Sequence, residues 1–341
     1  MAAILTFGML TVPAAAEAAE AEDEEAAEVI EISTAEELAA IADNLSADYV
    51  LTDDIDLAGI EWTPIGSFVS QEVDGEMSEI PDPEYAFTGT FDGAGHTIRN
   101  LSINQPEAWV LGLFGCISEA VIGEFNLENA SVIGSMMVSD TVGYAYLSQV
   151  IDVNLTGGVV VAREGEANEE GMYGGIVAAG MGSRIENCSA DAAVIIPDHT
   201  ANAGIIGGGL ELTSVVNCSA AGTVIAGNNC YGLGGISGCG FGAEEFTDCT
   251  ATDVVIVSGE GCFWIGGITG YAGGYQDEAY GYPVTVFTNC CTENMTIISD
   301  EDAEGVNDIV GSGFFNEEVA ETNGAPFDQP TEFELVNCEA K

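Results

Sequence analysis

The chain has 341 residues, and its 57 acidic side chains outnumber four basic ones, which gives a formal net charge of −53. Because phosphate groups are bound by Lys and Arg, this charge excludes nucleic acids and anionic membranes as partners. It is compatible with high solubility, a salty exterior or cation binding. A hydrophobic content of 47% and 44 glycines predict a folded chain rather than a disordered one.

The first 30 residues predict export. Residues 2–13 form an apolar run that is too short to span a bilayer, and Ala14-Ala15-Ala16 provides an A-x-A cleavage pattern. We therefore predict a signal-peptide remnant over residues 1–16, without its basic n-region, and a solvated acidic tail over residues 17–30. No later run predicts a membrane span, so the expected location is secreted, in the extracellular cell envelope.

Residues 31–341 are expected to form one elongated domain of short β-strands. At its start, the capping signal Ser33-Thr34-Ala35-Glu36-Glu37 predicts a short helix over about 34–43. Short β-rich runs follow at 49–57, 87–93 and 96–103, and Gly, Asp and Asn residues separate them.

From residue 111 onward the sequence repeats. Each unit has a Gly-rich half, such as LGGISGCG (233–240), and a second half with an Asn or Asp, such as VVNCSAAGTV (215–224). Aligned on that residue, successive units are 28, 33, 30, 31, 41 and 48 residues apart. A step near 30 residues, with several short β runs and no helices, predicts the coils of a parallel β-solenoid. The aligned positions are Asn126, Asn154, Asn187, Asn217, Asp248, Asn289 and Asn337.

The residue after each aligned Asn or Asp indicates which way this column faces. Leu127 and Leu155 occupy the positions that cysteines occupy in later units, and free Cys behaves as a small hydrophobic residue. We therefore predict an inward-facing column, with the preceding Asn buried at a turn. Coils about 4.8 Å apart would stack these Asn residues into an amide ladder. The cysteines of this column are Cys188, Cys218, Cys249, Cys290 and Cys338.

Three motifs in the first third of the chain carry a family resemblance. They are ISTAEELAAIADNLSADYVLTDDIDLAGIEWTPIGS from residue 32, FTGTFDGAGHTIRNLSI from residue 87, and GLFG from residue 112. Together they resemble bacterial and archaeal surface proteins with GLUG-type repeats. The resemblance implies a right-handed parallel β-helix and an exported adhesin or envelope component, with no family-wide catalytic residues. The acidic, Gly-rich and Cys-bearing composition also resembles that of archaeal sheath and surface-layer proteins.

The remaining cysteines are candidates for covalent or metal chemistry. Cys230 and Cys262 each lie five residues before a glycine of the repeat, so a disulfide between them is predicted. His199 lies five residues before another such glycine, which leaves a His199, Cys230 and Cys262 metal site as an alternative. Cys116 and Cys239 could join neighbouring subunits as surface thiols, and Cys291 should point outward, opposite to Cys290.

Other candidate sites have simpler explanations. His96, Arg99 and Asp92 contain a base and a cation, as polysaccharide lyases require, but they lie within the GLUG-type motif, so a structural role is expected. The acidic runs 53–56 and 300–302 offer oxygen ligands for Ca²⁺, the one cofactor considered, without a calcium-loop pattern. Among the N-x-S/T sequons, Asn44, Asn129 and Asn294 are the glycosylation candidates.

Together these features predict a structural protein without catalytic activity. The chain ends in LVNCEAK, the start of a coil's last strand, and we expect self-assembly into a sheath or layer by edge pairing or by disulfides. A cell-surface adhesin that binds glycans is the alternative, and a polysaccharide-degrading β-helix enzyme is the third hypothesis. The aromatic residues that would favour the adhesin are Trp109, Tyr144, Tyr146, Tyr231, Phe263 and Trp264.

Overall fold

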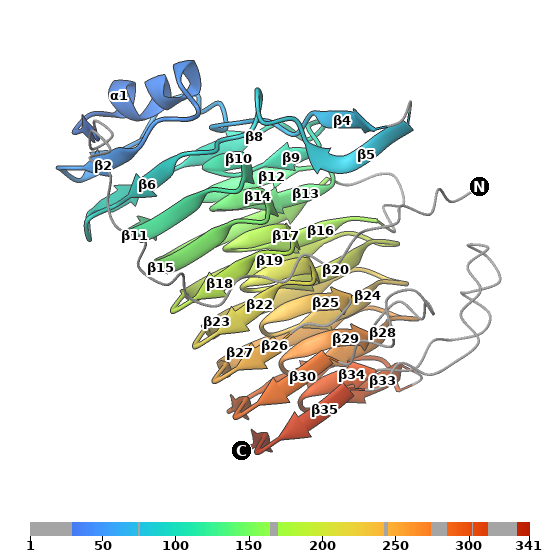
Figure 1. Cartoon of the computed structure of the whole chain (residues 1–341). Helices are drawn as coiled ribbons and strands as arrows, with labels where there is room; N and C mark the ends of the chain where they lie inside the picture. Colours follow the sequence, from blue (N-terminus) through green and yellow to red (C-terminus); the bar gives the residue numbers. More distant parts are fainter. Residues whose placement is uncertain are drawn as a thin grey trace.

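The computed structural model describes residues 29–73, 76–163, 170–241, 245–273, 285–301, 303–312 and 333–341. The chain forms a β-solenoid of about six turns, with about 31 residues per turn and one short helix near its N-terminal end (Figure 1). This confirms the predicted all-β solenoid and its short helix. The predicted signal peptide and nearly all of the predicted acidic tail lie outside the described residues.

The largest sheet collects strands from every coil, and neighbouring coils pair in parallel. Its early strands are β1 (Ile30–Ile32), β2 (Tyr49–Leu51), β3 (Ile55–Asp56), β6 (Thr90–Asp92), β7 (Thr97–Arg99), β8 (Ser102–Asn104), β11 (Val121–Glu128), β12 (Ser131–Gly134) and β15 (Gln149–Ala162). Its later strands are β18 (Arg184–Glu186), β19 (Ser189–Ile196), β22 (Ser214–Val216), β23 (Ser219–Ala226), β26 (Glu245–Thr247), β27 (Thr250–Ser258), β30 (Thr285–Thr288), β31 (Cys291–Glu293), β32 (Thr296–Ile298), β35 (Phe333–Val336) and β36 (Glu339–Ala340).

Two seven-stranded parallel sheets complete the coils, and one antiparallel hairpin lies beside the first of them (Figure 1). One sheet comprises β10 (Phe114–Ser118), β14 (Val142–Tyr146), β17 (Val177–Met181), β21 (Gly207–Glu211), β25 (Ser237–Phe241), β29 (Thr269–Gly273) and β34 (Val310–Ser312). The other comprises β9 (Val110–Leu111), β13 (Met137–Ser139), β16 (Met172–Gly174), β20 (Ala201–Gly204), β24 (Tyr231–Gly234), β28 (Phe263–Gly266) and β33 (Glu304–Asn307). The hairpin pairs β4 (Ser70–Val73) with β5 (Glu76–Pro81).

The predicted helix caps the first coil. Helix α1 (Ala35–Ala39) begins after Thr34, whose side chain accepts a hydrogen bond from the Glu37 amide, and the Glu37 side chain accepts from the Thr34 amide in return. The 3₁₀ helix η1 (Ala40–Asp43) continues it, and the buried Leu38 and Ile41 side chains join the solenoid core. No helix of the described residues is long and apolar enough to cross a membrane.

The large sheet buries alternate side chains, which fixes the register of the coils. In β15, β19 and β23 the aligned Val160, Val194 and Val224 are fully buried, and they stack as one column inside the solenoid. Stacked β-branched side chains fill a pleated surface well, so these runs form strands rather than helices.

The Gly-rich halves of the repeats allow the two smaller sheets to approach each other closely. A Cβ atom on Gly204 would lie 2.4 Å from the Gly207 carbonyl oxygen and 2.7 Å from the Gly238 amide nitrogen. Both distances are shorter than any normal contact of a side chain, so the chain can fold back on itself here only at glycine. This is the structural reason for the Gly-rich half of the repeat.

Candidate functional site

Five of the predicted ladder residues, together with Glu124 and Asp152 of the early coils, form an exposed column at one corner of the solenoid. Each adopts the left-handed backbone conformation, with φ between +51° and +56°. Asn and Asp tolerate this conformation better than other non-glycine residues, because their short side chains bond locally. The left-handed positions are Glu124, Asp152, Asn187, Asn217, Asp248, Asn289 and Asn337.

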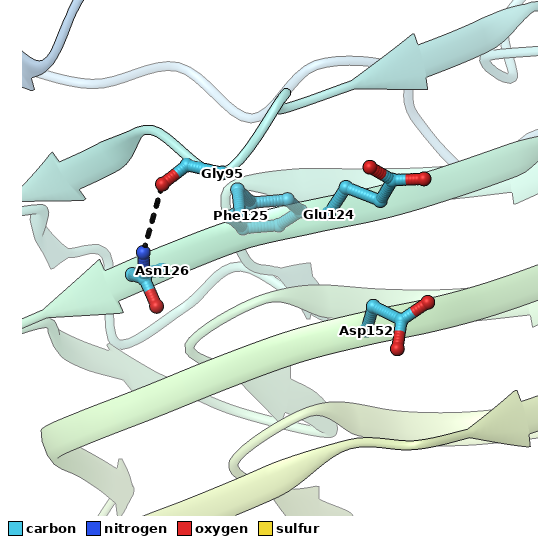
Figure 2. A pocket seen from close by; sticks show the side chains of 5 residues that line it. All are labelled: Gly95, Glu124, Phe125, Asn126 and Asp152. Atoms are coloured by element: carbon cyan, nitrogen blue, oxygen red, sulfur yellow. Dashed lines mark hydrogen bonds between the residues drawn. The ribbon is translucent and has the colours of Figure 1, made fainter.

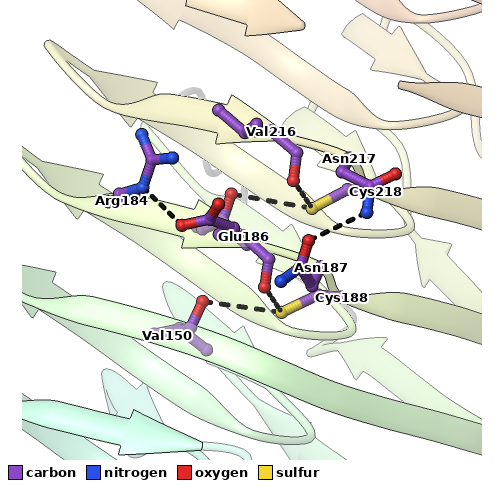
Figure 3. A network of polar contacts seen from close by, with 9 residues as sticks. Val150, Arg184, Glu186, Asn187, Cys188, Val216, Asn217 and Cys218 are labelled. Carbon is purple, nitrogen blue, oxygen red and sulfur yellow. Dashed lines mark hydrogen bonds and ion pairs between the residues drawn. The ribbon is translucent and has the colours of Figure 1, made fainter. Parts of the chain in front are cut away.

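Amide groups link successive coils along this column. The Asn217 amide nitrogen donates to the Asn187 side-chain oxygen over 2.8 Å (Figure 3). The Asn289 amide nitrogen donates to Asp248 over 2.9 Å. Asn337 donates to Asn289 over 3.3 Å. The prediction that Asn154, Asn187 and Asn217 are buried is wrong, because all three are exposed. Asn187 and Asn217 lie at a left-handed corner, which turns their side chains outward.

Two of the predicted ladder residues belong to a different column. Asn154 donates to Asn126 over 3.2 Å, but its partner in the next coil is Ser189, at a step of 35 residues rather than 33. Leu155 accordingly pairs with Ala190 and not with Cys188. The predicted equivalence of Leu127 and Leu155 with the cysteines is therefore wrong by two residues.

The cysteine column does face inward, and its predecessors in the early coils are Phe125 and Val153. Each thiol lies near a backbone carbonyl of the preceding coil. The Cys188 sulfur lies 3.5 Å from the Val150 carbonyl oxygen (Figure 3). The Cys249 sulfur lies 3.3 Å from the Val215 carbonyl oxygen. The hydrogen bond with the Cys188 thiol, followed by burial, raises the pKa of Cys218 well above its ordinary value. A buried thiol with a raised pKa is a poor nucleophile, which agrees with a packing role for Cys218. Cys188, Cys218, Cys249 and Cys290 are buried, and Cys338 is half-buried.

Cys230 and Cys262 stack directly on one another, because Tyr231 pairs with Phe263 in the adjoining strands. The Cys230 amide donates to the Cys262 sulfur over 3.3 Å. The contact between the two thiols raises the pKa of Cys230 and lowers that of Cys262. The thiols are unbonded in the structure, and the disulfide between them stays a prediction.

The metal-site prediction at these cysteines is wrong. Ala201 pairs with Tyr231, so His199 lies opposite Asn229 and Thr200 opposite Cys230. This shift of one residue leaves the His199 side chain exposed while the two thiols are buried. Within the described ranges, no group of three or more His, Cys, Asp or Glu side chains is placed to hold a metal ion.

The other cysteines are less accessible than predicted. Cys116 and Cys239 are buried, so the prediction that they are surface thiols is wrong. Burial raises the pKa of Cys116 to about 12. Cys291 is half-buried, and its thiol lies 3.6 Å from the Thr250 hydroxyl oxygen.

The His and Arg residues of the FDGAGHTIRN motif link two early coils. Asp54 accepts a hydrogen bond from the Thr97 amide over 3.0 Å, and its carboxylate lies 3.4 Å from the His96 ring. The Thr97 amide, with smaller contributions from His96 and Arg99, lowers the pKa of Asp54. The Asn100 side-chain amide donates a hydrogen bond to the Asp56 carboxylate over 2.8 Å. Asp54 and Asp56 of the acidic run 53–56 are thus bonded to different residues of the motif, and their carboxylates do not gather around one position as cation ligands would.

The remaining members of these candidate sets are also occupied locally. Asp92 accepts from the Ala94 amide over 2.7 Å. Asp300 accepts from the Glu301 amide, and Asp302 lies outside the described residues. The three glycosylation candidates, Asn44, Asn129 and Asn294, are all exposed.

One shallow depression lies beside the corner column in the early coils (Figure 2). The Asn126 amide donates to the Gly95 carbonyl over 3.2 Å at its edge. The carboxylates of Glu124 and Asp152, from adjoining coils, border it, and Phe125 lies beside Glu124 in the view.

Aromatic residues gather on the later coils. The rings of Tyr231 and Phe263 stack 5.1 Å apart at an interplanar angle of 12°, and both are half-buried. Trp264 lies edge-on to both and stacks on Tyr271. Of the other predicted aromatic residues, Tyr144 and Tyr146 are buried, whereas Trp109 is 67% exposed.

Comparisons with known proteins show a shared fold and one local sequence match. No family model matches the chain. Halomucin from Haloquadratum walsbyi is 40% identical over 111 residues, which is 30% of this chain and 1% of halomucin. The chain thus spans only a small part of the curated relative that it matches.

Two solved structures are similar to the chain to different degrees. One, from Bacteroides ovatus and provisionally named an immunoglobulin A1 protease, matches 91% of this chain and 83% of its own, with a TM-score of 0.56 and 18% identity. Another, named IgA1 protease, matches 75% of this chain and 21% of its own, with a TM-score of 0.41 and 16% identity. At this identity the likeness to the Bacteroides ovatus structure shows a common solenoid fold and nothing more.

Proposed function

We propose that this chain is an exported structural β-solenoid of the cell envelope, which self-associates into a sheath or surface layer and has no catalytic activity. The observation that carries the proposal is the repeated linking of the coils. Hydrogen bonds donated by Asn side-chain amides join the coils along the exposed corner column. Contacts between thiols and backbone carbonyls join them along the inward cysteine column. Side chains of both columns are committed to holding coils together, which suits a durable scaffold.

Charge and sequence similarity support a position outside the cell. A net charge of −53 keeps a protein dissolved where salt is high, because carboxylates remain hydrated and mutual repulsion is screened. The local match to halomucin from Haloquadratum walsbyi, a cell-surface protein, agrees with an extracellular location. The predicted signal-peptide remnant points the same way.

Electron microscopy of negatively stained protein tests the assembly. In molar salt we expect extended or layered particles, and addition of a reductant separates assembly through disulfides from assembly through surfaces. Monodisperse monomers with and without reductant would contradict the proposal.

Peptide mapping tests the thiols in the same samples. After alkylation without reduction, we expect a crosslinked peptide pair that contains Cys230 and Cys262, because these residues stack in adjoining coils. The Cys188–Cys218 pair serves as the internal control. Recovery of both Cys230 and Cys262 in alkylated form would show that they remain thiols.

Glycan binding is a second candidate, favoured by the stacked rings of Tyr231 and Phe263. Half-exposed parallel rings offer a flat apolar surface, on which the apolar face of a sugar can stack. A glycan array compared between the wild type and Tyr231→Ala tests this, with Trp109→Ala as the control on another surface. Binding that Tyr231→Ala leaves unchanged would remove the candidate.

The name of the Bacteroides ovatus structure also suggests an assay. Incubation with immunoglobulin A1, followed by gel electrophoresis, should show intact heavy chains if this chain has no catalytic activity. Specific cleavage would overturn the non-catalytic part of the proposal.

A further inference from the structure

An uninterrupted aliphatic column runs along the outer side of the large sheet. Successive coils place one branched aliphatic side chain in the same register, from β12 through β15, β19, β23 and β27 to β32. We call this column the aliphatic face, and its members are Ile133, Val161, Ile195, Ile225, Val257 and Ile298.

The alternation of the strands shows that this column points away from the core. Val194 and Val224, which precede Ile195 and Ile225, are fully buried inside the solenoid. Successive residues of a strand point to opposite sides, so the isoleucines lie outside. Ile225 is 40% exposed and Ile298 is 55% exposed.

The aliphatic face is bordered on one side by a second uncharged column. The column two residues earlier on each strand also faces outward, and it carries only Ser, Val, Ala and Thr side chains. Twelve consecutive outward positions across six coils therefore lack a carboxylate, in a chain with 57 acidic residues. An apolar surface of this extent marks an interaction site.

We propose that the aliphatic face packs against the same face of a second copy of this chain. A basic partner would be attracted to the acidic remainder of the surface rather than to a neutral face. A partner that carries the same charge of −53 can approach closely only where neither copy has carboxylates. The face meets that requirement, so its chemistry fits a second copy of this chain.

The geometry of the face suits self-packing. Six coils at about 4.8 Å give a flat strip roughly 25 Å long, and two such strips related by a two-fold axis present the same ridges to each other. The sheets would pack about 10 Å apart, like the two layers of a β-sandwich. This lateral contact rests on the self-association proposed above and specifies its surface.

Salt should control the contact. At low ionic strength the repulsion between two acidic copies extends over about 10 Å, whereas at about 1 M it falls to about 3 Å. Salt does not weaken the burial of aliphatic surface, and strongly excluded salts strengthen it. Association should therefore increase with salt, the opposite of a contact made by ion pairs.

Light scattering coupled to size-exclusion chromatography tests the inference on the full chain. In about 2 M NaCl the wild type should form dimers or larger species, and in about 0.1 M NaCl it should be mostly monomeric. Ile225→Asp should weaken the association by at least about tenfold. It removes an isoleucine that the contact would bury, and it adds one negative charge to the contact from each copy. Leu212→Asp is the matched control, because Leu212 is also an exposed aliphatic residue, at 53%, but follows β21 on another sheet.

Each result is decisive. Loss of association in Ile225→Asp alone supports the inference. Equal association of the wild type and Ile225→Asp overturns the inference but leaves self-association by another surface intact. A wild type that stays monomeric in high salt overturns both the inference and the self-association. If circular dichroism shows that Ile225→Asp is unfolded, Ile225→Thr takes its place, since it keeps the β-branched shape, and an unchanged association of that variant likewise contradicts the inference.

Discussion

The early and later coils fill the same core with side chains of different sizes. One inward column begins with Phe125 and Val153 and continues as Cys188 and Cys218. The neighbouring inward column changes from Leu155 to alanine at the same point. A solenoid can therefore change the volume of a column without changing its register.

A third inward column changes in the opposite direction. Val215 in the later coils pairs with Phe246, and Phe246 pairs with Phe287, whose ring stacks on it at 4.9 Å. Larger rings accompany the smaller Cys side chains in the coils of Phe246 and Phe287, but the coils of Ile185 and Val215 have Cys and Ala with no such ring. Protein cores accept exchanges that keep the total volume, so a ring offsets smaller neighbours only in the two later coils.

Asp140 is an exception within the early coils and gives the largest expected effect. Both carboxylate oxygens are buried without a hydrogen-bond partner among the described residues, and the neighbouring coils carry Gly112 and Gly175 at this position. Burial raises the pKa of Asp140 to about 8 from an ordinary value of 3.8. The folded chain thus keeps a proton that the unfolded chain releases.

The pH dependence of stability follows from this difference. Between about pH 4 and pH 8 the folded state binds more protons than the unfolded state, so stability is lost as pH rises, by an amount on the order of 5 kcal/mol. Below about pH 4 the Asp140 carboxyl group is protonated in both states, so its burial no longer makes stability depend on pH. Asp140→Asn should remove this dependence, so the variant should gain stability relative to the wild type as pH increases.

Guanidinium unfolding at pH 5 and pH 8, followed by circular dichroism, measures the effect as a difference between the two proteins. The acids Asp54 and Glu186 have lowered pKa values and act in the opposite direction, but they are the same in both proteins and cancel. A difference between wild type and variant that does not change with pH would contradict the buried, protonated Asp140.

Truncation within one column sharpens the comparison of early and later coils. Phe125→Ala should destabilise the chain by about 3–5 kcal/mol, because it leaves a large cavity among packed rings. Cys218→Ala, at the equivalent position, should cost only about 1 kcal/mol, since it removes one small group and one weak hydrogen bond. Guanidinium midpoints of both variants provide the measurement.

Equal losses from Phe125→Ala and Cys218→Ala would show that the cysteine column has a role beyond filling space. Both variants should be measured in the presence of a reductant, so that disulfide formation cannot contribute. Leu127→Ala, in the neighbouring early column, serves as the control for a second large cavity.

The repeat period could be predicted from the sequence because the corner residues are chemically uniform. Asn187, Asn217 and Asn289 each precede a cysteine, and the left-handed corner requires a residue of that type. The register of the early coils could not be predicted in the same way. Strand β15 contains an irregularity between Thr156 and Gly158, and Asn154 imitates the motif two residues after the true corner. The sequence signal for the true corner in this strand was Asp152, which directly precedes the inward-facing Val153.

The candidate sites were less predictable, because they depend on single-residue register. His199 is exposed while Cys230 is buried, although both lie five residues before a glycine. The aliphatic face was missed because an apolar run such as Val194-Ile195-Ile196 does not show which of its residues point outward. Only pairing across coils reveals that Ile195 and Ile225 share one outer column.

The corner column gives a smaller effect than the truncation of Phe125 and separates backbone strain from hydrogen bonding. Asn217→Ala should cost about 2 kcal/mol, because alanine resists the left-handed conformation and the bond to Asn187 is lost. Asn217→Gly loses the same bond without the strain and should cost under about 1 kcal/mol. Asn154→Ala is the early-coil counterpart, since Asn154 donates to Asn126 without a left-handed backbone, and it should resemble the glycine variant. Equal thermal stability of Asn217→Ala and Asn217→Gly would show that the amide ladder, and not the corner conformation, selects Asn in the later coils.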